Sequence, residues 1–416
     1  MKRKLNIGIF TIMLSETNGT AEATRRLVIG LARAGHDVHV FSPTNGVSTE
    51  KGVIFHKAGG FRMSRKPEFH FALPLTRYFF NRHGYYKDLE VVHAVTPMTM
   101  GWLAMDIAKL YGIPKIITHH SPLKYYSGDY FPVIGKLFAL YAWTYERFIY
   151  NRFHAIHVPT LSKKGLIVKH KLKEPIFALT NGILDKFFQT SKNARSEVCE
   201  YYKIPEDKKI LLYAGRQGPE KNVESKVRAL RRIRDQNIDA HLILAGGGPQ
   251  IPYLKSYAEE LGVADHVTQT DWIKYEWLRK IYNAADVSTL YNNIEAQGLV
   301  LLEAMAQGTP CVGKNATGIS DVIVNGKTGY LASNEEEFAD KIKKLLLDDD
   351  LREQMGKNAL DHVIKNHKMS NIVPIWERIY KFIIDHVMPM HAYHVPEPEI
   401  VEEWREFIAR EPLVYM

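Results

Sequence analysis

Short apolar segments alternate with stretches of helical periodicity from the start of the chain. Apolar runs of about four to eight residues bounded by polar turns indicate buried strands, whereas apolar residues three or four positions apart indicate amphipathic helices. This alternation is typical of βα units that build a parallel sheet. In the first half it predicts strands at residues 6–13, 37–41, 91–95, 115–119 and 155–159, with helices at 21–34 and 102–111.

The alternation stops at a polar stretch, residues 181–205, which is typical of a linker. A second series of strands is predicted at 209–215, 240–245, 266–269, 287–290 and 310–312. We therefore expect an α/β protein with two Rossmann-like, doubly wound domains, 1–190 and 205–368, and a helical segment, 369–416, that packs back on the first. Because ligands bind at the carboxyl ends of the strands in such sheets, we expect the site in a central cleft that the two domains face.

The chain has 416 residues, of which 45% are hydrophobic and 24% charged, and this composition excludes wholesale disorder, collagen and a polytopic membrane protein. The net charge of +9 indicates either an acidic partner or a device for solubility. Cys199 and Cys311 are the only cysteines and lie far apart in sequence, so we expect neither a disulfide framework nor a bound metal.

The start of the chain carries three basic residues followed by an apolar run at 5–14. Polar residues interrupt this run and no cleavage site of small residues follows it, so the pattern favours a buried first strand over a signal peptide. No run of about 18 apolar residues occurs elsewhere. We therefore expect a cytoplasmic protein.

Two loops that follow predicted strands carry residues suited to a phosphate. Gly19 lies in a turn before a helix, where backbone amides and the helix N-terminus favour an anion; an ordinary turn capped by Thr20 is the alternative. Arg216 and Lys221 follow the strand at 209–215 and suit a diphosphate, unless they belong to a solvated basic loop.

The segment 295–310 is the most informative part of the chain. Gly298 opens an apolar helix, which places the amides of Gly298 and Leu299 at an N-terminus suited to phosphate. Glu295 precedes this helix, and Glu303 lies more than one turn inside it. Because a buried carboxylate is costly without a partner, sugar hydroxyls are fitting ligands for Glu303.

Together these motifs resemble the retaining GT-B glycosyltransferases of family GT4. The resemblance rests on the E-x7-E spacing of Glu295 and Glu303 and on G-R-x-x-x-E-K-N at 215–222, and it covers roughly residues 5–385. The supporting motifs are N-G-I-L-D at 181–185, G-G-G-P at 246–249 and A-A-D-V at 284–287. The glycines of the G-G-G-P turn serve either packing or ligand contact. The resemblance implies a GT-B fold, a nucleotide-sugar donor, and no metal or other cofactor; the acidic run at 348–350 reads as a helix cap rather than a D-x-D metal site.

The resemblance also implies residue roles at the donor. Arg216 and Lys221 would hold the diphosphate and stabilise charge on the departing nucleotide, and Glu295 would contact the transferred sugar. Glu303 would accept the ribose hydroxyls. The remaining donor contacts would be the backbone amides of Gly19, Gly298 and Leu299, and Ile273 beside the base.

His120 completes the implied catalytic residues, beside Arg216, Lys221 and Glu295. It follows the strand predicted at 115–119 and corresponds to the family's active-site histidine, near the donor sugar and the acceptor. A structural histidine is the alternative, and the neighbouring His119 is a second candidate for the same role.

Two features bear on the acceptor. Many GT4 members have an aromatic residue where Gln297 stands, and E-x-Q-G-L resembles the diacylglycerol glucosyltransferase branch, as does Leu73-Pro74. The segment 61–90 interleaves cations with aromatic residues, which suits an anionic membrane surface, unless the aromatic residues belong to the core. The segment 136–152 has a similar composition, or is a packed helix.

We therefore expect a retaining hexosyltransferase, peripheral on the cytoplasmic face of a membrane, that moves glucose from UDP-glucose to a lipid hydroxyl such as that of diacylglycerol. The alternative has the same fold and donor class and acts on a soluble sugar, sugar phosphate or other small acceptor. A GT-B epimerase fits the motifs less well. A nucleic-acid partner is not expected, because no helix-turn-helix, zinc or RNA-binding signature occurs and the glutamate pair would be unexplained.

Overall fold

The computed structural model describes residues 3–15, 18–46, 50–62, 70–73, 84–120, 122–123, 135–293, 295–386 and 398–410. The chain forms two compact units. One unit comprises Met1–Gly182 together with Met369–Met416, and the other comprises Ile183–Lys368. The chain therefore passes between the units twice, after Gly182 and after Lys368.

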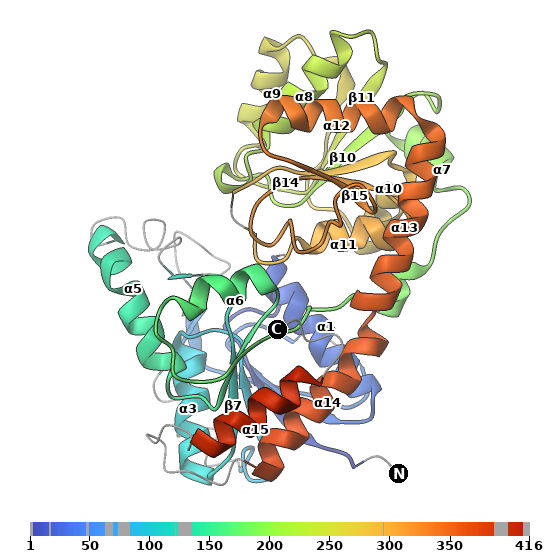
Figure 1. The fold of residues 1–416 in the computed structure, drawn as a ribbon. Helices are drawn as coiled ribbons and strands as arrows, with labels where there is room; N and C mark the ends of the chain where they lie inside the picture. The colour runs from blue at the N-terminus through green and yellow to red at the C-terminus, as the bar shows by residue number, and fades with distance from the viewer. Residues whose placement is uncertain are drawn as a thin grey trace. The chain divides into compact units, whose positions relative to one another are not determined.

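The first unit is built on a parallel sheet of seven strands in the order β3-β2-β1-β6-β7-β8-β9 (Figure 1). Its strands are β1 Asn6–Phe10, β2 Asp37–Ser42, β3 Val53–Lys57, β6 Val91–Ala94, β7 Lys115–Thr118, β8 Ala155–Val158 and β9 Ile176–Ala178. Its helices are α1 Gly19–Arg33, α3 Thr99–Tyr111, α5 Gly135–Tyr150, α6 Leu161–Val168, α14 Met369–His386 and α15 Pro398–Ala409. A short antiparallel ribbon pairs β4 Gly60–Arg62 with β5 His70–Ala72.

The second unit is built on a parallel sheet of six strands in the order β12-β11-β10-β13-β14-β15. Its strands are β10 Lys209–Ala214, β11 Ala240–Ala245, β12 Val267–Gln269, β13 Val287–Leu290, β14 Cys311–Lys314 and β15 Gly329–Ala332. Its α-helices are α7 Ala194–Tyr202, α8 Glu224–Arg234, α9 Ile251–Glu260, α10 Tyr275–Ala284, α11 Leu299–Ala306, α12 Glu335–Leu347 and α13 Asp349–His367. Three short 3-10 helices are η2 Asp185–Phe188, η3 Pro219–Lys221 and η4 Ala264–His266.

The predicted α/β class, with two Rossmann-like parallel sheets, is confirmed. The apolar run near the start forms β1, in which Ile7, Ile9 and Phe10 are fully buried. Among the described strands, five escaped prediction: β4 and β5 of the short ribbon, and the edge strands β3, β9 and β15 of the two parallel sheets. Because an edge strand is short or covered on one side only, it lacks the continuous apolar run that marks a central strand of a parallel sheet.

The polar stretch predicted as a linker contains two elements, η2 and α7. Helix α7 buries Val198 and Cys199 and packs on α10 of the second unit. The first unit therefore ends at Gly182 rather than near residue 190. Only three residues of this short polar helix are buried, Ala194, Val198 and Cys199, so the sequence shows little periodicity.

The last helices lie in the first unit. A Cβ atom on Gly30 of α1 would come within 2.8 Å of the Met369 and Val373 side chains of α14, so glycine permits the close approach of these helices. In α15, Trp404 is buried and its ring lies 5.7 Å from that of Phe177 in β9. The segment after Lys368 therefore packs on the first unit through α14 and α15.

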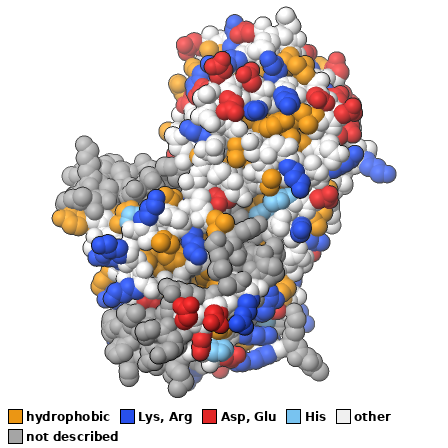
Figure 2. All heavy atoms as spheres, viewed as in Figure 1, with side chains coloured by type: hydrophobic (Ala, Val, Ile, Leu, Met, Phe, Trp, Pro, Cys, Tyr) orange, Lys and Arg blue, Asp and Glu red, His pale blue; other side chains and the backbone are white. Residues whose placement is uncertain are grey.

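Acidic and basic side chains are interspersed over the second unit on the face drawn in Figure 2. Some form ion pairs, such as Arg228 with Glu335 at 2.6 Å. On this face the basic excess is therefore not gathered into a single patch of the second unit. No helix in the described part of the chain has the length and apolar composition that crossing a bilayer requires.

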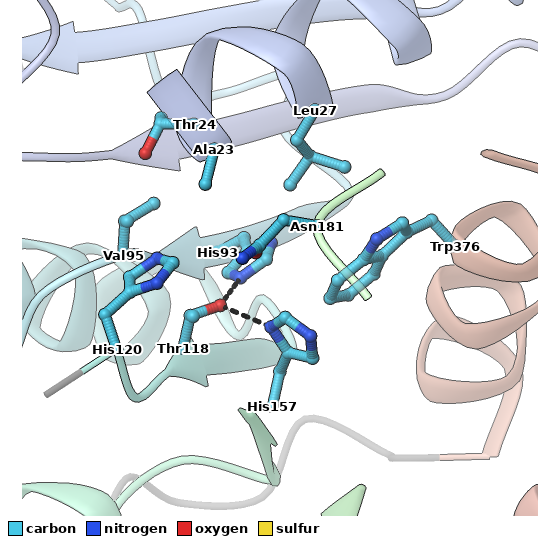
Figure 3. Close-up of a pocket in the computed structure, with 10 residues that line it drawn as sticks. All are labelled: Ala23, Thr24, Leu27, His93, Val95, Thr118, His120, His157, Asn181 and Trp376. Carbon is cyan, nitrogen blue, oxygen red and sulfur yellow. Dashed lines mark hydrogen bonds between the residues drawn. The ribbon is translucent and has the colours of Figure 1, made fainter. Parts of the chain in front are cut away.

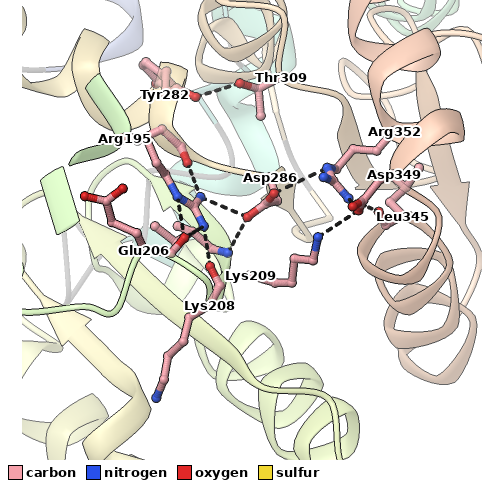
Figure 4. A network of polar contacts seen from close by, with 12 residues as sticks. Arg195, Glu206, Lys208, Lys209, Tyr282, Asp286, Thr309, Leu345, Asp349 and Arg352 are labelled. Carbon is pink, nitrogen blue, oxygen red and sulfur yellow. Dashed lines mark hydrogen bonds and ion pairs between the residues drawn. The ribbon is translucent and has the colours of Figure 1, made fainter. Parts of the chain in front are cut away.

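Asp286, from the A-A-D-V motif, joins three elements of the second unit (Figure 4). One carboxylate oxygen accepts hydrogen bonds from Arg195 Nη1 of α7 at 3.0 Å and from the Ile210 amide of β10 at 2.7 Å. The other oxygen lies 3.3 Å from Arg352 Nε of α13. Because only 12% of this side chain is exposed, the motif has a structural function here.

Replacing Asp286 should destabilise the second unit. Asp286→Ala leaves Arg195 and Arg352 without their shared carboxylate, and we expect a loss of about 3 kcal/mol in the free energy of unfolding. Asp349→Ala is the matched control, because Asp349 contacts Lys209 and Arg352 but its side chain is 63% exposed, so its loss should be much smaller. Urea unfolding of both variants measures the difference, and equal losses would contradict the assignment.

Candidate functional site

The carboxyl ends of neighbouring strands β10 and β13 bring Lys221 and Glu295 together. Lys221 lies in η3, after β10, and its Nζ is 2.8 Å from Glu295 Oε2. Asn292 Nδ2 donates to the same oxygen at 3.3 Å, and the Ala296 amide donates to Oε1 at 3.1 Å. The predicted cation and carboxylate therefore meet at the edge where parallel sheets bind ligands.

These contacts determine the charge of Glu295. Burial raises the pKa of its carboxyl group, but the Lys221 ammonium and the hydrogen bonds from Lys221, Ala296 and Asn292 together hold the pKa below its ordinary value. Glu295 is therefore a carboxylate at neutral pH, held in one position by several donors.

Arg216 lies in the same loop and also has an acidic partner. Its Nη1 is 2.9 Å from Glu220 Oε1, and its carbonyl accepts a hydrogen bond from the buried Tyr213 hydroxyl at 2.8 Å. Each of the two predicted diphosphate cations thus contacts a carboxylate. A bound diphosphate would take the place of these carboxylates as the partner of Arg216 and Lys221.

The G-G-G-P turn packs against the loop that carries Arg216. A Cβ atom on Gly246 would lie 2.4 Å from the Gly215 carbonyl oxygen, and one on Gly248 would lie 2.2 Å from that of Gln217. No side chain fits at either distance, so packing requires glycine at both positions. Of the two functions considered for this motif, packing or ligand contact, the structure supports packing. The buried Gln217 adds a hydrogen bond from Nε2 to the Thr270 carbonyl at 3.2 Å.

Helix α11 begins at the predicted place. Gly298 precedes it with a φ of 72°, a left-handed conformation that favours glycine, and Leu299 is its first residue. This geometry directs the first-turn amides of α11 out of its N-terminal end. Ile273 lies half-buried in the loop before α10, beside the exposed Trp272.

Glu303 is buried in α11 and contacts two tyrosines. Tyr282 donates to Oε2 at 2.7 Å, and Tyr275 donates to Oε1 at 3.4 Å. The sequence expectation that sugar hydroxyls satisfy this buried carboxylate is therefore incomplete, because α10 already supplies donors. A carboxylate has about four acceptor positions, so ribose hydroxyls remain compatible with these contacts.

Gly19 begins helix α1 in the first unit. The cap is Asn18 rather than the expected Thr20: Asn18 Oδ1 accepts from the Ala21 amide at 2.9 Å. Gly19 is exposed, and a Cβ atom there would meet nothing within 4 Å. The packing of the described residues therefore does not require glycine at this position.

The structure separates the two candidate histidines. His119 is fully buried, and its Nδ1 is 2.8 Å from the Tyr150 hydroxyl and 4.0 Å from Glu146. His120 is 9% exposed and lines a small cavity of about 20 Å³ with Asn181 and other residues of the first unit (Figure 3). His119 is therefore structural, and His120 is the histidine placed at a hollow.

Beneath His120, a chain of hydrogen bonds crosses the carboxyl edge of the first sheet (Figure 3). His93 Nε2 and His157 Nδ1 lie 2.7 and 3.0 Å from Thr118 Oγ1, while Tyr380 bonds His93 Nδ1 at 2.8 Å. His157 Nε2 lies 2.7 Å from the Leu179 carbonyl, which can only accept. One proton arrangement satisfies every bond: Tyr380 donates to His93, His93 to Thr118, Thr118 to His157, and His157 to Leu179.

The histidines at this edge are neutral. Burial lowers the pKa of His93 well below its ordinary value and lowers that of His157 to about 4. Burial above all, with the nearby Lys163 ammonium, lowers the pKa of His120 to about 3. His120 therefore offers a ring nitrogen for hydrogen bonding at neutral pH rather than a positive charge.

The acidic run at 348–350 is a helix cap, as predicted. Asp348 Oδ1 accepts from the Leu351 amide at 2.9 Å and caps α13. Among the residues that the structure describes, no group of three or more histidine, cysteine or acidic side chains is arranged to hold a metal ion.

Two families of known proteins match the chain. The family described as "Glycosyltransferase Family 4" matches residues 17–186, and the family described as "Glycosyl transferases group 1" matches residues 195–362. The two matches follow one another along most of the chain. The chain therefore carries a family 4 glycosyltransferase domain followed by a glycosyl transferases group 1 domain.

The similarity to known relatives extends over different shares of their length. It is 33% identical over 191 residues to an N-acetyl-alpha-D-glucosaminyl L-malate synthase of Bacillus anthracis, which is 45% of this chain and 49% of that protein. It is 25% identical over 399 residues to an alpha-monoglucosyldiacylglycerol synthase of Streptococcus pneumoniae, 92% of this chain and 86% of that protein. The match thus spans about half of the first relative and most of the second.

Solved structures share the fold. HepE of Anabaena in complex with UDP-glucose superposes with a TM-score of 0.74 at 15% identity, over 91% of this chain and 99% of that one. At this identity the likeness shows the fold, which is GT-B.

Several residues of the site were not expected from the sequence, among them Tyr282 beside Glu303 and the chain of His93, Thr118 and His157. A signal for the latter was present. His93 and His157 each interrupt an otherwise apolar strand, Thr118 ends the strand between them, and the three strands are neighbours in the sheet.

The neutral state of His157 makes stability depend on pH. Its pKa is about 4 in the folded protein and 6.5 when unperturbed, so the unfolded chain binds the proton first and stability is lost as pH falls below 6.5. Between about pH 7.5 and pH 5, the wild type should lose about 2 kcal/mol more free energy of unfolding than His157→Gln. Urea unfolding at both pH values measures this, and parallel losses in the two proteins would refute it.

Proposed function

We propose that this protein is a retaining hexosyltransferase that transfers glucose from UDP-glucose to a lipid hydroxyl, such as that of diacylglycerol, on the cytoplasmic face of a membrane. The observation that carries the proposal is the Lys221–Glu295 pair, held at 2.8 Å at the carboxyl edge of the second sheet. This pair places a cation for the diphosphate next to a carboxylate for the sugar. No metal or other cofactor takes part.

When the donor binds, its diphosphate replaces the carboxylates as the partner of Lys221 and Arg216. Both cations turn from Glu295 and Glu220 to phosphate oxygens, where they stabilise the charge that grows on the departing UDP. Glu295 keeps its bonds from Ala296 and Asn292, so it stays in place to accept hydroxyls of the transferred sugar. Gly19 and the α11 amides add backbone donors, Glu303 accepts the ribose hydroxyls, and Ile273 flanks the base.

The reaction retains the configuration of the sugar. The bond from the anomeric carbon to the phosphate oxygen breaks as the bond to the acceptor oxygen forms on the same face, and the acceptor proton passes to the departing phosphate. His120 takes part as a neutral group that hydrogen-bonds sugar or acceptor, since its pKa of about 3 excludes a charge. The complex of HepE with UDP-glucose supports UDP-glucose as the first donor to test.

The lipid acceptor is supported by the relative named alpha-monoglucosyldiacylglycerol synthase and by exposed apolar side chains of the first unit. On the β4–β5 ribbon, Phe61 is 57% and Leu73 45% exposed. On α5, Tyr141 and Phe148 are exposed, and the Arg152 guanidinium lies 3.4 Å above the Phe148 ring. Tyr86, in contrast, is fully buried, so part of the segment 61–90 is core; its residues 63–69 and 74–83 lie outside the described residues.

A small soluble acceptor is the second candidate. The relative named N-acetyl-alpha-D-glucosaminyl L-malate synthase matches with higher identity, over a shorter stretch. The name of this relative gives L-malate, a small acid, as the group that is joined to the sugar. The same donor site would serve both candidates, so the choice depends on the first unit.

Two substitutions at the pair should have different effects. Lys221→Met removes a diphosphate cation, and we expect UDP binding to weaken and kcat/KM for the donor to fall about 100-fold or more. Glu295→Gln releases Lys221 and removes a negative charge beside the diphosphate, so UDP should bind at least as tightly while transfer is lost. Calorimetric titration with UDP and a transfer assay measure both effects. Wild-type transfer by either variant would exclude these roles.

The acceptor proposal is tested with vesicles that contain diacylglycerol and an anionic phospholipid. Purified protein with UDP-glucose should form a glycolipid and should float with the vesicles. Glycosyl transfer to soluble acceptors, by protein that stays in the aqueous fraction, would favour the second candidate. Vesicles without diacylglycerol are the control, and formation of glycolipid in them would point to a different lipid acceptor.

A further inference from the structure

A buried lysine lies directly behind the Lys221–Glu295 pair. Lys226 belongs to α8 and is only 1% exposed. Its Nζ donates to three backbone carbonyls: Lys221 at 3.0 Å, Asn222 at 2.9 Å and Tyr291 at 3.2 Å. The first two lie in the loop after β10, and the third lies directly after β13. One side chain therefore joins the loops that carry the two members of the pair.

The three carbonyls indicate the protonation state of the Lys226 side chain. An ammonium group has three N–H donors and no acceptor, and each donor of Lys226 has one carbonyl oxygen. A neutral amine would direct its lone pair at one of these oxygens. The ring of the buried Tyr213 lies 4.9 Å from Nζ and favours a cation as well. Burial, together with the nearby Lys221 ammonium, lowers the pKa of Lys226 well below its ordinary value, while the three carbonyl acceptors and the Tyr213 ring favour the protonated form.

We infer that Lys226 is a positioning residue that sets the place of Lys221 and Glu295 relative to each other. Its bond to the Lys221 carbonyl fixes the backbone from which that cation extends. Its bond to the Tyr291 carbonyl fixes the residue before Asn292, which in turn donates to Glu295. This inference rests on the proposed function, because it assigns Lys226 to the site where the donor diphosphate binds.

A purely structural lysine would act differently. If Lys226 served only to hold α8 on the sheet, its loss would lower the fraction of folded enzyme, and kcat would fall with the KM of the donor unchanged. A positioning residue instead changes the affinity of correctly folded protein for the donor. An error of about 1 Å in the place of a binding group is sufficient to cost up to 100-fold in rate.

The test compares Lys226→Met with Leu230→Met. Lys226→Met leaves an unbranched side chain that is one atom shorter and removes the three donors. Leu230 is fully buried one turn further along α8, so Leu230→Met changes the packing of the same helix face without touching the carbonyls. We expect Lys226→Met to bind UDP about tenfold more weakly and to show a raised KM for the nucleotide sugar, with the KM of the acceptor unchanged. Leu230→Met should match the wild type in UDP affinity, in the KM of the nucleotide sugar and in the KM of the acceptor.

The possible outcomes distinguish failure of the proposed function from failure of the inference about Lys226. Wild-type protein that binds no UDP overturns the proposed function and this inference with it. Equal UDP affinity of wild type and Lys226→Met, both folded by circular dichroism, overturns the inference alone. If Lys226→Met does not fold, Lys226→Gln takes its place. Its amide keeps two N–H donors, which favours folding, but it is one atom shorter and cannot supply all three carbonyls. The UDP affinity of this variant should therefore still fall, and an unchanged affinity overturns the inference.

Discussion

The cost of removing charge from water governs the donor site of the second unit. Burying a charged group costs several kcal/mol unless it is paired and hydrogen-bonded, and Lys226 and Glu303 are almost fully buried while Glu295 is largely so. Each of the three has partners from an element other than its own: backbone carbonyls for Lys226, tyrosines for Glu303, and Lys221 for Glu295. These partners are in place in the protein alone, so in the proposed function a diphosphate exchanges the partners of Lys221 and Arg216 rather than creating charges without partners.

The first unit meets the same constraint with neutral groups. His93, Thr118 and His157 lie side by side on neighbouring strands, and a single direction of proton donation satisfies all of them. The chain of bonds starts at Tyr380, on the helix that follows the second crossing, and ends at the Leu179 carbonyl, close to the first crossing. The surroundings of His120 are thus fixed by the two segments at which the chain leaves this unit and returns to it.

Central strands were predictable from the sequence, because a strand buried on both faces is a continuous apolar run. The edge strands β3, β9 and β15 and the helix α7 were not predicted: β3 has one buried residue in five, β9 and β15 have only three and four residues, and α7 buries three residues of nine. The motifs located Lys221, Glu295 and Glu303, but the partners of these residues come from positions far away in the chain. Tyr282 and Lys226 carry no local pattern that marks them, and their function is visible only once the helices are placed.

The central claim is that a donor diphosphate takes Lys221 away from Glu295. A crystal structure of the wild-type protein with UDP-glucose tests it most directly. The account predicts Lys221 Nζ within hydrogen-bond distance of a diphosphate oxygen, beyond about 4 Å from Glu295, with the Glu295 carboxylate on the sugar hydroxyls. A nucleotide sugar bound elsewhere, with the Lys221–Glu295 pair intact, would contradict it.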